Sequence, residues 1–127
     1  MKIGHKIWLE KDGKVFFGMG RYELLKAIDE FHSLSAAAKK LKMSYRAAWG
    51  RLKASEERLD IKLVERSKGK GMHLTPETLA LLEEFDRLER EAETFLQETS
   101  RNLLSSLKNR AENQPFRGHP EKTEHKD

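Results

Sequence analysis

The side chains best suited to chemistry in this sequence are basic, and they are concentrated in one stretch of the chain. Residues 33–75 contain eleven lysines and arginines against four acidic residues, a local charge of +7. Residues 76–100 contain two basic and eight acidic residues, a local charge of −6. A basic block of this kind is typical of a surface that binds a polyanion, although a solvated basic face has the same composition.

The basic block includes a predicted helix that begins at a capping serine, Ser44, and continues to about Leu59. Helical periodicity places four residues of this segment on one side, where we expect them to pack inward: Ala48, Leu52, Ser55 and Leu59. The opposite side, nearest the start of the helix, presents Tyr45, Arg46, Trp49, Gly50 and Lys53. An α-helix fits the major groove of DNA, and its first turns are where base edges and phosphates are contacted.

Each residue of this face has an expected role. Arg46 is the candidate for a bidentate contact with guanine, and Ser44 and Tyr45 can reach phosphates or base edges. Trp49 is a candidate base contact, with partly buried packing as the alternative. Gly50 is expected to permit close approach to DNA or to a neighbouring helix, and Arg51 and Lys53 are expected to contact phosphates.

Two flanking segments are expected to contribute further contacts. Ser35 begins the preceding helix, which also carries Lys39 and Lys40; these two lysines suit phosphate contacts or ordinary solvation. After the Ser44 helix, two short strands at 62–66 and 72–75 enclose a loop rich in glycine and lysine. That hairpin places Arg66, Lys68 and Lys70 on the flanking backbone or in the minor groove.

The remaining elements position these residues. A hairpin around Asp12-Gly13 precedes a helix over 21–32, and another helix starts near Ser35, where Ser35 is the expected N-cap. Thr75 and Pro76 are typical of an N-cap and first position for a final helix. The pattern predicts a mainly α protein: a winged helix-turn-helix with an N-terminal β-hairpin, a β-hairpin wing and a long C-terminal dimerisation helix.

The final helix carries an apolar seam with steps of three and four residues. Its members, which we assign to dimerisation, are Leu81, Phe85, Leu88, Ala92, Phe95 and Leu103. We therefore divide the chain into a DNA-binding domain over 1–75, a dimerisation helix over 76–107 and a disordered polar tail over 108–127.

Other classes of function find little support. The chain has no cysteine, and its five histidines are scattered without metal-ligand spacing, so we predict no metal site, no cofactor and no enzyme activity. Apolar runs fall short of the roughly 20 residues that a membrane span needs. We expect a cytoplasmic protein without a membrane contact.

Three stretches together resemble a known family. Ser35–Ala38, the run Met43-Ser44-Tyr45-Arg46-Ala47-Ala48-Trp49, and Leu63–Arg66 with the glycine-rich wing resemble the N-terminal DNA-binding domain of the molybdate-responsive ModE regulators. Those domains are similar to LysR-type winged helices. The resemblance covers about residues 5 to 105 and implies that Ser44, Tyr45, Arg46 and Trp49 lie on the recognition helix.

The resemblance does not extend to the family's molybdate-binding domains, so we expect no small-molecule ligand within this chain. The sequence predicts a homodimeric regulator that binds double-stranded DNA. The alternative is a protein-interaction module that pairs with, or antagonises, a full-length regulator through its C-terminal helix.

Overall fold

A computed structural model describes residues 1–113; of the expected tail over 108–127, residues 114–127 lie outside the described residues. The described chain divides into two compact units, one comprising residues 5–91 and the other comprising residues 1–4 together with the described residues after 91. The boundary between the two units falls within the final helix. We describe each unit by itself.

The N-terminal hairpin consists of β1 (Trp8–Lys11) and β2 (Lys14–Gly18), which pair antiparallel with Leu9 opposite Phe17. Both residues of the connecting turn have positive φ, 53° at Asp12 and 78° at Gly13. A two-residue turn with this backbone matches the right-handed twist of its strands, which is why the Asp-Gly pair predicts a hairpin. Phe17 is fully buried and brings the hairpin into the core.

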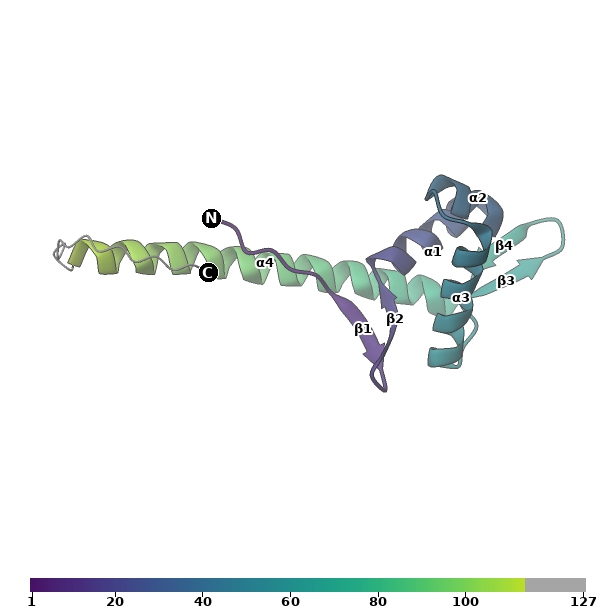
Figure 1. Cartoon of the computed structure of the whole chain (residues 1–127), viewed down its shortest axis with the longest axis horizontal. Helices are drawn as coiled ribbons and strands as arrows, with labels where there is room; N and C mark the ends of the chain where they lie inside the picture. Colours follow the sequence, from purple (N-terminus) through teal and green to yellow (C-terminus); the bar gives the residue numbers. More distant parts are fainter. Residues whose placement is uncertain (114–127) are drawn as a thin grey trace. The chain divides into compact units, whose positions relative to one another are not determined.

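Three helices follow and form the body of the domain (Figure 1). They are α1 (Met19–Phe31), α2 (Leu34–Lys40) and α3 (Tyr45–Leu59). The N-cap of α2 is Ser33, whose hydroxyl accepts a hydrogen bond from the Ala36 amide at 3.0 Å, so the expectation of Ser35 as the cap was wrong. The earlier start places Leu34 inside the helix and in the core, where it is 2% exposed.

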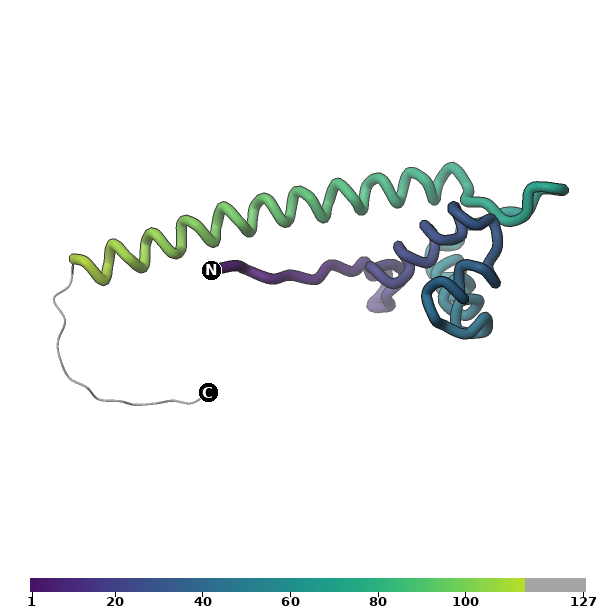
Figure 2. Tube along the Cα trace, turned by 90° about the horizontal axis from the view of Figure 1, so that it is seen from above, coloured from purple at the N-terminus to yellow at the C-terminus, as the bar shows by residue number. Residues whose placement is uncertain are grey.

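The wing is formed by β3 (Val64–Ser67) and β4 (Gly71–Leu74), which pair antiparallel with Val64 opposite Leu74. It extends away from the three helices in both views (Figures 1 and 2). The amide of Met72 donates to the His32 carbonyl at 2.9 Å, which ties β4 to the end of α1. Gly71, with φ of 71°, permits this approach, because an added Cβ would lie 2.5 Å from the His32 oxygen.

The final helix, α4, runs Pro76–Asn113, six residues beyond the expected boundary at 107. Thr75 caps it as predicted: its hydroxyl accepts from the Thr78 amide at 3.3 Å and lies 3.0 Å from the Lys62 carbonyl. Within residues 5–91, Phe85 packs on Phe17 with ring centroids 4.9 Å apart. Tyr22 of α1 donates to Asp86 at 2.6 Å, so the first turns of α4 are joined to the body of the domain.

The fold is therefore a mainly helical winged helix-turn-helix, as predicted. Its core joins the hairpin, the three helices, the base of the wing and the start of α4. Phe85, which we assigned to the dimer seam, is 2% exposed and belongs to this core. In the part of the chain over 1–113, no helix is long and apolar enough to cross a membrane.

Candidate nucleic-acid interface

The start of α3 projects two unpaired side chains into solvent. The Ser44 hydroxyl accepts from the Ala47 amide at 3.0 Å, which confirms it as the N-cap. Lys42, with φ of 59°, makes the turn, and the Met43 amide donates to the Ala38 carbonyl at 3.0 Å. This tight connection leaves Tyr45 49% exposed. Among residues 1–113, neither Tyr45 nor Arg46 forms a side-chain hydrogen bond or ion pair.

One turn further along α3, Trp49 and Lys53 form a contact on the same face. The Lys53 ammonium lies 4.6 Å from the centre of the Trp49 ring and 3.0 Å from a Glu56 carboxylate oxygen. Trp49 is nevertheless 44% exposed, so it is available to a partner. These two contacts reduce the conformational freedom of the Lys53 side chain. Lys53 is therefore partly paired within the chain, which its position in the sequence did not reveal.

Glu56 connects α3 to the base of the wing. Its second carboxylate oxygen accepts from the Leu63 amide at 2.9 Å, immediately before β3. Burial by itself raises the pKa of Glu56, but hydrogen bonds from the Leu63 amide and Lys53 outweigh burial and leave the pKa lowered. The carboxylate is thus held in its charged form, and it links Lys53 to the wing.

Gly50 lies on the exposed face with no heavy atom within 4 Å of an added Cβ. No neighbouring helix among residues 1–113 approaches it, so within this chain Gly50 permits no close helix packing. The space next to Gly50 is open, so a large partner can approach the backbone of α3 closely.

The residues of α2 lie at the neighbouring edge of the domain. Ser35, Lys39 and Lys40 are all exposed. Lys40 pairs with Glu30 at 2.9 Å and lies 5.3 Å from the centre of the Phe31 ring, whereas Lys39 has no ion pair among residues 1–113. An exposed pair such as Lys40–Glu30 contributes little stability, so Lys40 can exchange this partner for a phosphate at small cost.

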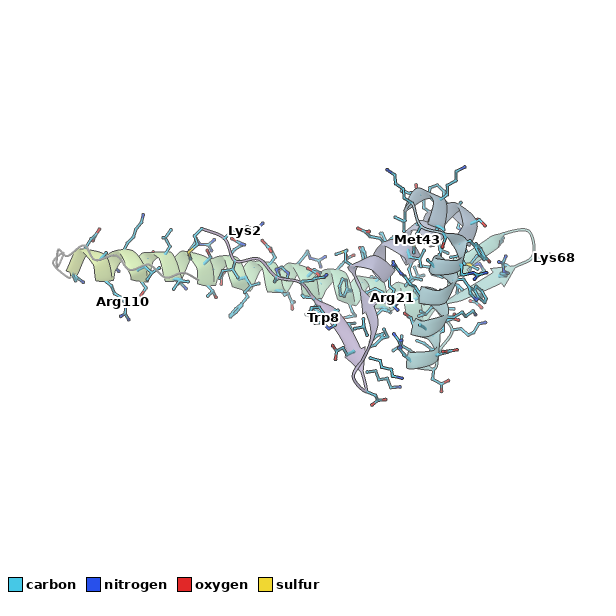
Figure 3. The ribbon with its side chains drawn as sticks, viewed as in Figure 1. Lys2, Trp8, Arg21, Met43, Lys68 and Arg110 are labelled. Atoms are coloured by element: carbon cyan, nitrogen blue, oxygen red, sulfur yellow. The ribbon has the colours of Figure 1, made fainter. Side chains whose placement is uncertain are left out.

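The wing carries a group of exposed cations. Arg66, Lys68 and Lys70 are all exposed, and Lys68 lies at the tip of the hairpin (Figure 3). None of the three forms an ion pair within residues 1–113. Gly69 has φ of 78°, a backbone conformation that favours glycine, which explains the glycine in this turn.

Arg51 is separated from the other predicted contacts. It lies on the side of α3 that faces the first turn of α1, and its Nη1 atom would be 3.9 Å from a Cβ added at Gly20. The same side of α3 carries Ser55, which donates to the Phe16 carbonyl at 2.6 Å, and Arg58, which donates to the Val15 carbonyl. The structure thus brings Arg51 close to Arg21, a residue that sequence reasoning missed.

No metal centre is evident in the described residues 1–113, where no group of three or more His, Cys, Asp or Glu side chains could hold an ion. His119 and His125 lie outside the described residues. The candidate site is a cationic surface with exposed aromatic groups.

Comparisons with known proteins agree with this geometry. Residues 19–78 match the bacterial regulatory helix-turn-helix protein, lysR family. Residues 19–78 are therefore similar to the helix-turn-helix domain of LysR-type regulators. The chain is also 37% identical over 83 residues to the transcriptional regulator ModE of Haemophilus influenzae, covering 62% of this chain and 32% of that protein. The chain thus spans about a third of the length of that relative. These names describe regulators and not enzymes.

Solved structures of LysR-type proteins have the same fold. A complex of the CbnR DNA-binding domain with DNA is 27% identical, with a TM-score of 0.52, and the match covers 71% of this chain and 99% of that one. CbnR itself, a LysR family transcriptional regulator, is 29% identical with a TM-score of 0.51, covering 67% of this chain and 29% of CbnR. The BenM DNA-binding domain, crystallised with its benA site, shares the fold at 24% identity and a TM-score of 0.52.

Proposed function

We propose that this chain is a sequence-specific transcription regulator that inserts the start of α3 into the major groove of DNA. The observation that carries the proposal is the exposed, unpaired Tyr45–Arg46 pair directly after the Ser44 cap. Two exposed groups at the amino end of a helix are placed to meet base edges and phosphates. The similarity to a DNA-bound CbnR domain supports the same use of this surface.

The other assigned residues would support this contact. Ser44 and Trp49 extend the α3 surface, and Gly50 lets the backbone approach the groove. The exposed lysines and serine of α2 would contact one phosphate backbone, and the wing would contact the adjacent one. Lys53 would contact phosphate only by exchanging part of its pairing with Glu56.

We further propose that the chain binds DNA as a homodimer joined through α4. The final helix exposes apolar side chains along its length: Leu88, Phe95, Leu103, Leu104 and Leu107 are between 37% and 65% exposed. Leu81 and Ala92 are partly buried and lie along the same row. A row of apolar residues at helical spacing is stabilised by pairing with a second helix. A twofold dimer would place two recognition helices about one DNA turn, roughly 34 Å, apart.

The double variant Arg46→Ala with Lys53→Ala tests the recognition surface. We expect operator affinity to fall by about 10–200-fold, because one good bidentate base contact is worth roughly 1–3 kcal/mol and a phosphate contact is lost with it. Binding is measured by fluorescence anisotropy on a site selected from random DNA, at fixed salt. Arg110→Ala, on the exposed end of α4, is the matched control. Unchanged affinity of the double variant would refute the assigned surface.

The exposed row on α4 also favours the alternative of an interaction module for a full-length regulator. Sedimentation equilibrium of the chain with and without DNA separates the two proposals. A dimer that binds DNA supports the regulator. A monomer without DNA affinity that forms a heterodimer with a full-length regulator of this family supports the module.

A further inference from the structure

Arg21 lies close enough to Arg51 and Arg58 to interact with both electrostatically, on the side of α3 that faces the first turn of α1. Arg51 and Arg58 lie on one face of α3, because residues seven apart on a helix are neighbours along it. Arg21 lies in the first turn of α1, where that helix faces α3 (Figure 3). Ser55, between the two arginines of α3, hydrogen-bonds to the Phe16 carbonyl at 2.6 Å and holds this face against β2.

The three guanidinium groups lack a counter-charge. Among residues 1–113, no carboxylate forms an ion pair with any of them. Arg58 donates to the Val15 carbonyl, which is a neutral partner. The Nε atom of Arg21 is buried and has no hydrogen-bond partner. Burial lowers the pKa of Arg21, and the positive charges of Arg58 and Arg51 lower it further. A buried, unpaired donor next to like charges is costly unless an anion joins it.

The first turn of α1 adds to the positive potential. Its N-cap, Gly18, provides no side-chain cap, and the turn contains no acidic residue. Gly20 is exposed and has no side chain, so nothing of its own fills the space next to Arg51. The first N–H groups of a helix have no partner within the helix and carry the positive end of its dipole.

We propose that Arg21, Arg51 and Arg58 form a binding site for a phosphate-class oxyanion. A carboxylate has two acceptor oxygens, whereas three guanidinium forks and a helix amino end offer donors from several directions. A tetrahedral oxyanion has the number and arrangement of oxygens to meet them. The anion is either free phosphate or a phosphate of the DNA backbone outside the bases that α3 contacts.

Titration of the full chain with inorganic phosphate tests the site. Amide shifts of residues 19–22 and the Arg21 Nε–H signal are followed by two-dimensional NMR, with sodium chloride holding ionic strength constant. We expect saturable shifts at these groups with a dissociation constant on the order of 1 mM. Arg51→Gln is expected to weaken binding about fivefold or more, because one charge-assisted contact is lost. Arg110→Gln, far along α4 in sequence, is the matched control.

A second measurement separates the two sources of the anion. If the site takes a backbone phosphate, DNA itself shifts the amides of residues 19–22 and added phosphate then has no further effect. If it takes a free anion, the phosphate shifts persist in the DNA complex. The proposal is overturned if neither phosphate nor DNA shifts these amides, or if Arg51→Gln binds phosphate as tightly as the unaltered chain. Arg51 is exposed, so its replacement leaves the fold intact even if Arg21→Gln does not.

The proposed oxyanion site lies on a different surface of α3 from the proposed base contacts. Failure of the phosphate titration leaves the Arg46 and Lys53 experiment unaffected, and the reverse also holds. The two experiments therefore fail independently.

Discussion

One face of α3 presents Tyr45, Arg46 and Trp49 to solvent, whereas the opposite face holds Ser55 and Arg58 against strand β2. Both faces carry arginine, and both belong to the same helix. On the first face the side chains have few partners within residues 1–113, and on the second they hydrogen-bond to backbone carbonyls 39 and 43 residues away. The first face is free to bind a partner, whereas Ser55 and Arg58 on the second face also hold α3 against the hairpin.

This difference shows that charge alone does not distinguish a binding surface from a structural one. Arg46 and Arg58 have the same side chain and the same charge, yet only Arg58 joins α3 to the hairpin. Replacement of Arg46 should therefore lower DNA affinity, whereas replacement of Ser55 should lower the stability of the fold.

The largest expected effect on stability is at Ser55, which is 1% exposed. Ser55→Ala leaves the Phe16 carbonyl without its donor, so the free energy of unfolding should fall by about 1–3 kcal/mol. Urea denaturation followed by circular dichroism measures the change. Ser105→Ala, on the exposed part of α4, is the control. DNA affinity of the folded variant should stay unchanged, and a large loss of affinity would remove the distinction between the two faces.

Glu56 provides a second test of the difference between the two faces, because it connects Lys53 on the exposed face to the base of the wing. Its pKa is lowered in the folded state, so its contribution to stability is present above the pKa of the unfolded chain and is lost as pH falls through the folded pKa. Glu56→Gln should therefore lower the free energy of unfolding near pH 7 by about 1–2 kcal/mol and have less effect in acid. Urea titrations at pH 7 and in the acid range test this. An equal loss of unfolding free energy at both pH values would contradict a stabilising role for the Glu56 charge.

The smallest expected effect is at the wing. Lys68→Gln with Lys70→Gln removes two exposed charges, so the slope of log affinity against log salt should decrease in magnitude by up to about 2. Affinity should fall similarly on specific and unrelated DNA, since phosphate contacts carry no sequence information. Anisotropy titrations at several salt concentrations give both the salt slope and the affinities for specific and unrelated DNA. A loss confined to the specific site would mean that the wing contacts bases.

Local sequence patterns determined much of this protein. Ser44 and Thr75 are capping residues whose hydroxyls accept from amides three positions later, so the capping itself depends only on nearby residues. Asp12-Gly13 and the glycines of the wing likewise specify turns through their own backbone preferences. The winged helix-turn-helix and the exposed start of α3 followed from such patterns.

Tertiary structure alone decided which residues meet across the fold. Helical periodicity places Phe85 on an apolar row, but packing against Phe17, distant in sequence, made it part of the core instead of the exposed seam. The N-cap of α2 is Ser33 and not the expected Ser35, because burial of Leu34 requires the helix to begin earlier. The proximity of Arg21 to Arg51 and Arg58 depends on how α1 packs against α3, and a repeating pattern within one helix contains no information about its neighbour.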